Sequence, residues 1–250
     1  MFRPARTFLT RICVCTLLVL PAFAGDGKPA AAGSGKKVVV ELFTSQGCSS
    51  CPPADAYLAA LAARDDVIAL SFHVDYWNYI GWNDPFSSPE ATARQRAYGR
   101  ALQKRYVYTP QIVVDGRAEA VGSNRAVVSS LIKMAKAAQK IDIGVTRNAD
   151  GSADIRVPGA LPGGARAGEL WIGFYDAAVE TRVHAGENRG ETITNANIVR
   201  SYKRIGDWDG SALDIRVDLA ALGATGRDGC VIILQSTGSG PVLGAASFPL

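Results

Sequence analysis

Residues 38–63 read VVVELFTSQGCSSCPPADAYLAALAA, and this stretch decides the fold of the first half of the chain. Its β-branched apolar start, residues 38–43, is typical of a buried parallel strand. Its Ala-rich end, residues 52–63, has the composition and apolar spacing of a helix. The motif Cys48-Ser49-Ser50-Cys51 lies between them, so the sequence predicts a strand, a C-x-x-C loop and a helix in that order.

The C-x-x-C motif is the strongest chemical signal in the chain. Two cysteines at this spacing can form a reversible disulfide within a first helical turn, where free N–H groups and the helix dipole favour a thiolate. Pro52 and Pro53 are tolerated only in a first turn, so we expect the helix to begin near Ser49. Cys48 is then the more exposed N-cap residue and the attacking thiol, and Cys51 is the resolving thiol. A static disulfide is the alternative, but so small a loop restrains little of the unfolded chain, which favours redox chemistry.

The segments that follow alternate between strands and helices. We expect strands at residues 67–73, 111–115 and 117–121, and helices at residues 89–105 and 123–139. Asp115-Gly116 is a strong hairpin signal between the last two strands. Thr109-Pro110 directly precedes a strand in which proline cannot serve a central ladder, which suggests a special turn and points to a cis bond. The order of elements is β-α-β-α-β-β-α.

The pattern changes after residue 140 to short strands separated by turn residues. Seven strands are expected, at residues 141–147, 153–158, 169–175, 180–184, 213–219, 230–235 and 242–248. Strands at this spacing without helices predict an all-β sandwich-like domain. The sequence therefore predicts an α/β domain at residues 38–140 followed by a β-sandwich domain at residues 141–250.

Cys48, Cys51 and Pro110, in a β-α-β-α-β-β-α order, resemble the thioredoxin superfamily. The resemblance implies a thioredoxin-like fold for residues 38–140 and a catalytic set of these three residues. It also implies that Pro110 is a cis-proline facing the C-x-x-C motif, where Thr109 and Pro110 receive the substrate backbone. Glu41 lies near the position where thioredoxins keep a buried acid that assists proton transfer.

A second resemblance covers most of the chain. The stretches ELFTSQGCSSCPPAD, FHVDYWNYIGWNDPF, YTPQIVVDG and HAGENRG are similar to a family of secreted bacterial thioredoxin-like proteins known only as a domain of unknown function. This resemblance implies a fold and a compartment, but no reaction.

Two further features are expected beside the cysteines. His73 ends the second strand, and parallel strands finish at one sheet edge, so His73 is expected on the Cys48 side. It can tune the thiol or bind a metal there, or it can be a hydrogen-bonded strand-end residue. The loop of residues 75–88 is rich in aromatic residues, among them Tyr76 and Trp77. It can line a groove for an extended polypeptide, or pack as a cover over the sheet.

The N-terminus carries the pattern of a secretory signal peptide. Three arginines precede the uncharged residues 12–20, and Ala22-Phe23-Ala24 forms a small-residue cleavage box. We expect cleavage after Ala24, a flexible Gly/Lys-rich leader at residues 25–37, and a secreted or periplasmic protein without a membrane anchor. Removing three arginines lowers the formal net charge from +4 to +1, so nucleic acid is not an expected partner.

The sequence therefore predicts an exported thiol-disulfide oxidoreductase whose Cys48 and Cys51 act on protein thiols or disulfides together with an unidentified redox partner. No cofactor beyond the disulfide is expected. The alternative is a copper-handling or non-catalytic binding module, because copper(I) can use two thiolates and a histidine. Cys230 is expected to be a buried core residue. Whether the site oxidises, reduces or isomerises depends on thiol pKa values and the relative stability of the redox forms.

Overall fold

The computed structural model describes residues 1–2 and 37–250. The expected signal peptide apart from residues 1–2, and the expected leader apart from residue 37, lie outside the described residues. Within the described part of the chain, no helix combines the length and apolar character needed to cross a membrane.

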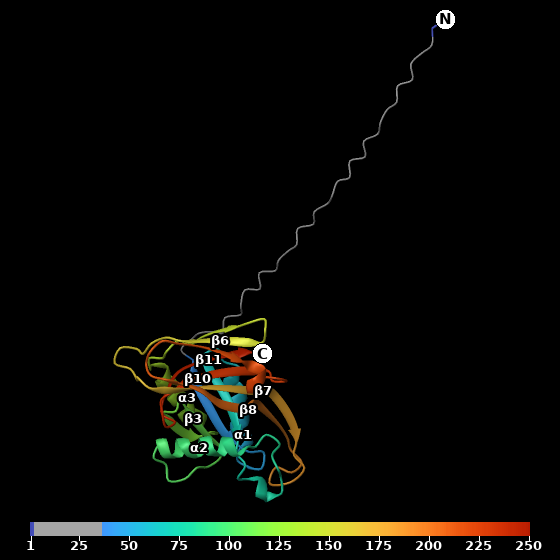
Figure 1. Ribbon diagram of the computed structural model, residues 1–250. Coiled ribbons are helices and arrows are strands. Elements are labelled where there is room, and N and C mark those ends of the chain that lie inside the picture. The colour runs from blue at the N-terminus through green and yellow to red at the C-terminus, as the bar shows by residue number, and fades with distance from the viewer. Residues whose placement is uncertain (3–36) are drawn as a thin grey trace.

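Strands from both halves of the chain form one eight-stranded sheet in the order β11-β10-β7-β8-β2-β1-β3-β4 (Figure 1). Its first-half strands are β1 (Val38–Thr44), β2 (Val67–His73), β3 (Gln111–Val114) and β4 (Ala118–Val121). Its second-half strands are β7 (Gly168–Arg182), β8 (Thr192–Trp208), β10 (Gly229–Gln235) and β11 (Val242–Pro249). The halves join where β2 pairs in parallel with β8 at Ser71 and Ile198. The fold is thus a mixed α/β arrangement around one large sheet that runs across residue 140.

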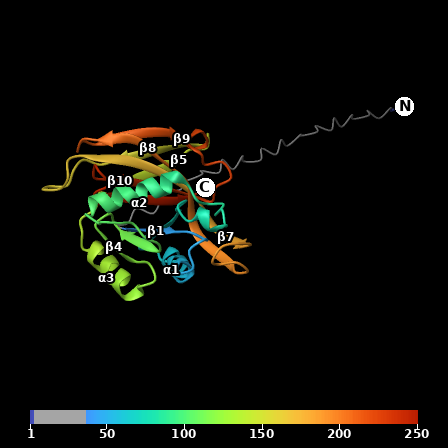
Figure 2. The ribbon, with the colours of Figure 1, turned by 90° about the horizontal axis from the view of Figure 1, so that it is seen from below.

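Helices cover both faces of the first-half strands. They are α1 (Pro52–Ala62), α2 (Pro89–Ala101) and α3 (Arg125–Lys136), with a short 3-10 helix, η1 (Asn78–Ile80). Figure 2 shows α2 on one side of β1, and α1 and α3 on the other. Alternation along β1 explains this, because Val38, Val40 and Leu42 pack under α1 and α3. Val39 and Phe43 pack under α2.

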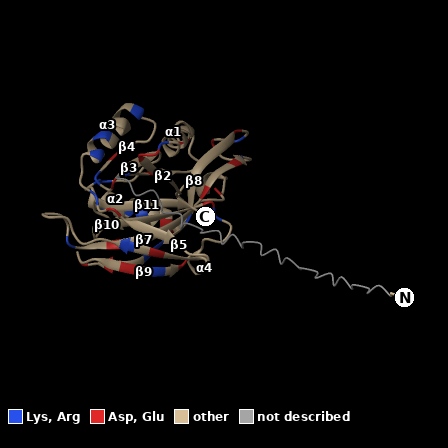
Figure 3. Ribbon diagram, turned by 90° about the horizontal axis from the view of Figure 1, so that it is seen from above, with Lys and Arg blue, Asp and Glu red and all other residues tan. Residues whose placement is uncertain are grey.

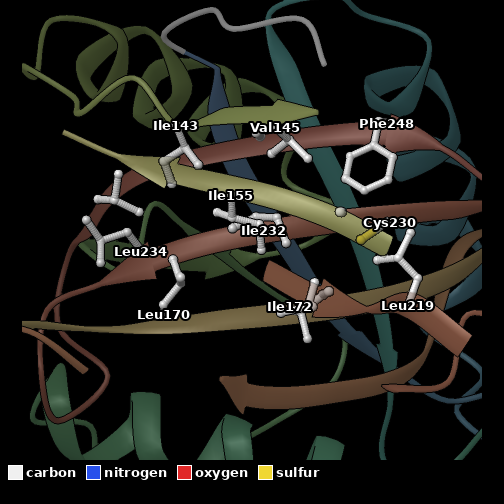
Figure 4. Packing of buried hydrophobic residues seen from close by; sticks show 14 of the residues in the cluster. Ile143, Val145, Ile155, Leu170, Ile172, Leu219, Cys230, Ile232, Leu234 and Phe248 are labelled. Carbon is white, nitrogen blue, oxygen red and sulfur yellow. The ribbon is translucent and has the colours of Figure 1, made fainter. Parts of the chain in front are cut away.

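A second, three-stranded sheet covers the other end of the large one. It consists of β5 (Gly144–Arg147), β6 (Ser152–Val157) and β9 (Leu213–Asp218), and a short helix, α4 (Leu219–Leu222), follows β9. Figure 4 shows Val145 and Ile155 of the small sheet over Ile232 and Leu234 of β10. Cys230 is fully buried in this core, as expected. The outer face of the small sheet carries charges of both signs (Figure 3), including the pair Arg156 and Asp214.

The structure corrects two expectations about secondary structure. Helix α1 begins at Pro52 with Cys51 as its N-cap, so the predicted start near Ser49 is wrong. The separate strands expected at residues 169–175 and 180–184 form one long strand, β7, which pairs with β8 in a hairpin. Strand β8 was not expected, because its asparagines and basic residues interrupt any regular apolar alternation.

Candidate functional site

The Cys48–Cys51 pair lies where β1 leads into α1. The two residues form a disulfide with their Cα atoms 5.4 Å apart. The Ser50 hydroxyl lies 3.3 Å from Cys48 Sγ. Pro52 and Pro53 open α1 and have no N–H, so the first turn offers fewer main-chain donors to a thiolate than an ordinary helix start. A hydroxyl beside the sulfur supplies one of the missing donors.

Both cysteines are buried, so Cys48 does not occupy the exposed N-cap position that the sequence led us to expect. Cys48 is 1% exposed and Cys51 is 0% exposed. The end of the β7–β8 hairpin, residues 183–191, lies against the C-x-x-C loop, and we call it the hairpin tip. Asn188 Nδ2 in the tip donates to the carbonyl oxygens of Gln46 at 2.8 Å and Cys48 at 3.0 Å. Sequence reasoning left this motif, HAGENRG, without a chemical role.

The expected cis-proline lies at the same sheet edge. The Thr109–Pro110 bond is cis. A Cβ at Gly122 would lie 2.9 Å from Ala54 in the first turn of α1 and 3.3 Å from the Pro110 ring, so only glycine allows these elements to approach so closely. Trp77 Nε1 donates to Thr109 Oγ1 at 2.7 Å.

The loop of residues 75–88, which we call the aromatic loop, lies along another side of the site. A Cβ at Gly47 would lie 3.3 Å from both Trp77 and Ile80, so this loop lies against the residue that precedes Cys48. Tyr76 instead donates to Gln95 Oε1 of α2 at 3.1 Å. Both aromatic side chains also pack against the core under α2. Trp77 therefore lies at the disulfide edge, while the Tyr76 hydroxyl points to α2.

A cluster of buried polar residues lies under α1 directly after the disulfide. We call it the polar cluster; its members are Thr44, Asp55, Ser71, His73, Asp84 and Asn195. Side-chain atoms of five of them, all except Asp84, have no hydrogen-bond partner among the residues that the structure describes. Unpaired buried polar atoms are rare, because each costs roughly 1–3 kcal/mol. Their concentration in one place makes this cluster a candidate functional feature.

Asp55 is the member nearest to the disulfide along the chain. It lies four residues after Cys51, which places both side chains on one face of α1. Burial raises the pKa of Asp55 to about 7, although the charge of His73 opposes the shift. A carboxyl group with this pKa can accept and release a proton near neutral pH.

His73 lies at the disulfide edge of β2, where it is paired in register with Thr44. Its Nδ1 lies 2.7 Å from Asp84 Oδ2, and both side chains are fully buried. Burial disfavours the Asp84 carboxylate, but the charge of His73 and hydrogen bonds from His73, Gln46 and Phe86 lower the pKa of Asp84 overall. Asp84 Oδ2 also accepts the main-chain N–H of Gln46 at 2.8 Å, so this carboxylate joins His73 to the loop before Cys48.

Glu41 lies elsewhere. Its side chain points to the α2 face of the sheet, where Arg94 Nε donates to Oε1 at 2.7 Å and the Tyr98 hydroxyl donates to Oε2. The position expected for a proton-transfer acid thus holds a buried ion pair, on the face opposite α1. Asp55 provides the buried acid on the disulfide side, and its place on the apolar stripe of α1 with Leu58 was the available sequence signal.

Metal ligands do not gather at the site in the described part of the chain. No group of three or more His, Cys, Asp or Glu side chains there is arranged to hold a metal ion. The third cysteine among the described residues, Cys230, lies in the core under the small sheet, where burial raises the pKa of its thiol.

Comparison with known proteins assigns the chain to a family. A search of the curated proteins gives no match. Among solved structures, the crystal structure of protein AGR_C_4864 from Agrobacterium tumefaciens is 30% identical with a TM-score of 0.73, and the match covers 86% of this chain and 94% of that one. The family model described as "Protein of unknown function (DUF1223)" matches residues 39–235. The chain therefore belongs to the DUF1223 family.

Proposed function

We propose that the protein is a thiol-disulfide oxidoreductase of the thioredoxin-like kind, exported from the cell, with the Cys48–Cys51 disulfide as its redox centre. The observation that carries the proposal is the placement of a C-x-x-C disulfide at the start of α1, beside the cis Thr109–Pro110 bond at one sheet edge. The strands β2-β1-β3-β4 with α1, α2 and α3 support a thioredoxin-like arrangement of the first half.

The reduced protein would transfer two electrons to a substrate disulfide. The Cys48 thiolate attacks one substrate sulfur, and the second substrate sulfur leaves as a thiolate, giving a mixed disulfide. Cys51 then loses its proton and attacks Cys48 Sγ, so the first substrate sulfur leaves as a thiolate and the Cys48–Cys51 disulfide forms again. The same steps in reverse oxidise a substrate dithiol.

Asp55 is the group we propose for the proton of Cys51. The ionised carboxylate of Asp55 accepts the thiol proton when Cys51 becomes the nucleophile, and returns it when the disulfide is reduced. Its pKa of about 7 suits transfer in both directions. The charge of His73 stabilises the charged form of this carboxylate, whereas the charge of Asp84 opposes it. Thr109, Pro110 and Trp77 form the neighbouring surface, where a substrate chain would lie.

The test is capture of the mixed disulfide. In a Cys51→Ser variant, Cys48 can attack a substrate but nothing resolves the product, so covalent partners should accumulate on non-reducing gels. Cys48→Ser, which lacks the attacking thiol, is the matched control. Partners that persist in the control, or none in either variant when each is expressed in its native compartment, would count against the proposal.

Binding of copper(I) is the second candidate, because the chain carries a dithiol and His73 ends the strand beside β1 at the same sheet edge, although the described residues do not gather there as a ligand set. The His73 ring is already held by Asp84, which leaves Nε2 as its available nitrogen. Titration of the reduced protein with copper(I), repeated with His73→Ala, separates the two functions. Tight binding that depends on His73 would favour the metal role, and absence of binding would remove it.

A further inference from the structure

We propose that the hairpin tip occupies the place of a protein substrate on the C-x-x-C loop. Asn188 holds the tip there, and we call this residue the latch. In this account the partner is an extended, cysteine-bearing polypeptide that displaces the tip and takes over its main-chain hydrogen bonds. The inference rests on the proposed function for its substrate, but closure of the site by the tip can be tested without turnover.

The burial of the disulfide requires such a movement. Cys48 Sγ must be reached by another sulfur, yet Cys48 is 1% exposed. A protein-bound sulfur cannot approach a covered sulfur unless part of the cover moves. The aromatic loop and the hairpin tip both lie against the C-x-x-C loop, and the tip is held there by hydrogen bonds from Asn188 and to Glu187.

Asn188 makes the contacts that resemble those of a bound peptide. Its single side-chain nitrogen donates to the carbonyls of Gln46 and Cys48, as two main-chain N–H groups of an extended chain would do. Asn188 itself is buried. The Cys48 carbonyl also accepts the N–H of Cys51 at 3.1 Å, so the Gln46 carbonyl is the one that depends on Asn188. A substrate segment that offers N–H donors can replace Asn188 at both carbonyls and keep Gln46 paired, whereas a small thiol cannot.

Glu187 adds a second contact with an electrostatic effect. Its Oε2 accepts the main-chain N–H of Ser49 at 3.1 Å. Interactions with the side chain and then the main chain of Ser49 lower the pKa of Glu187, so the tip places a carboxylate beside the C-x-x-C loop. Displacement of the tip therefore both uncovers Cys48 and frees an N–H group for its thiolate.

The tip is also shaped to lie against the aromatic loop. Gly186 has a φ of 74°, and a Cβ there would lie 3.1 Å from Trp82 Cβ. His184 and Trp82 rings meet edge to face at 6.0 Å. The tip thus rests on residues that can stay in place when Asn188 is exchanged for a substrate chain.

The experiment compares Asn188→Asp with Asn83→Asp. The first change keeps the shape of the latch but directs carboxylate oxygens at two carbonyl oxygens, and the second is the same change on an exposed residue of the neighbouring loop. We expect Asn188→Asp to raise the rate of iodoacetamide reaction at Cys48 of the reduced protein about tenfold or more, since both hydrogen bonds of Asn188 to the C-x-x-C loop are lost. Asn83→Asp should match the wild type.

Hydrogen exchange distinguishes release of the tip from general unfolding as the cause of faster alkylation. In Asn188→Asp, residues 45–50 and 184–190 should exchange faster while β1 and β3 keep their wild-type rates. Equal alkylation rates in both variants, or faster exchange throughout the sheet, would overturn closure by the tip. Because alkylation requires no substrate, this result stands apart from success or failure of redox turnover.

The partner class is tested with a cysteine peptide and its analogue N-methylated on both sides of the cysteine. The wild-type disulfide should react about tenfold faster with the unmodified peptide, and Asn188→Asp should react with small dithiothreitol faster than the wild type does. Equal rates for the two peptides would contradict recognition through main-chain N–H groups.

Discussion

His73 Nδ1 lies 2.7 Å from Asp84 Oδ2, and both side chains are completely buried beneath the C-x-x-C loop. Asp84 fixes the orientation of the imidazole and also binds the N–H of Gln46, two residues before Cys48. The charge of His73 in turn lowers the pKa of Asp55 against the effect of burial. One hydrogen-bonded pair therefore links the disulfide loop to the buried acid of α1.

Asp55 predicts a pH-dependent stability. Its pKa is 3.8 in ordinary surroundings and about 7 in the folded protein, so between these values the native state holds a proton that the unfolded chain has released. The free energy of unfolding should therefore fall as pH rises through this window, by up to about 1.4 kcal/mol per unit. Urea unfolding at pH 5, 6 and 7 should show this slope in the oxidised wild type and its loss in Asp55→Asn. Parallel slopes in the two proteins would contradict the assigned pKa.

Ser50 predicts the reactivity of Cys48. Ser50→Ala removes the hydroxyl that lies 3.3 Å from Cys48 Sγ, in a turn where two prolines offer no N–H. The pKa of the Cys48 thiol should rise by up to about one unit, since a hydrogen bond to a charged group contributes on the order of 1 kcal/mol. The alkylation rate of the reduced protein as a function of pH measures this. Ser50→Thr, which keeps the hydroxyl, should restore the wild-type profile, and failure to do so would assign the effect to packing.

We predict that the buried ion pair of Glu41 and Arg94 stabilises the folded protein but does not affect the reactivity of the cysteines. Arg94→Met leaves the Glu41 carboxylate without its partner and should lower the free energy of unfolding by about 3–5 kcal/mol. Glu41→Gln should also destabilise the protein, while the pH dependence of Cys51 reactivity stays at its wild-type value. If Glu41→Gln shifted that pH dependence and Asp55→Asn did not, the acid would be on the α2 face after all.

Cys230 should not react with alkylating reagents in the folded protein. It is fully buried, and burial raises the pKa of its thiol, so the reactive thiolate is disfavoured and inaccessible. Mass spectrometry of the reduced protein after brief alkylation should find label in the Cys48-Cys51 segment and none at Cys230. Label at Cys230 should appear only once urea unfolds the chain; labelling in the folded state would mean that the core beneath the small sheet opens.

Local signals predict the first half of this fold well. The apolar run before Cys48, the proline pair after Cys51 and the Asp115-Gly116 turn each act within a few residues, and β1, α1 and the β3–β4 hairpin follow from them. The cis bond at Pro110 was also indicated by its place before a strand. The sequence did not indicate the exact start of α1, because prolines restrict the first turn of a helix without specifying where the helix begins.

Long-range pairing explains what the sequence did not reveal. The two halves join into one sheet where Ser71 pairs with Ile198. No local sequence signal near either residue indicates this pairing. The polar strand β8 carries Asn195 into the cluster under α1, and the hairpin it forms brings Asn188 onto the disulfide loop. The division into domains at residue 140 stays a prediction, since the large sheet runs across it.

The reduction potential of the Cys48–Cys51 disulfide tests the central claim most directly. The oxidised protein is equilibrated with graded ratios of reduced and oxidised glutathione or dithiothreitol, and the fraction of dithiol is measured by alkylation and mass spectrometry. A redox centre should titrate reversibly within the range of thiol-disulfide oxidoreductases, about −120 to −270 mV. A potential below about −300 mV, typical of structural disulfides, would contradict the proposed function.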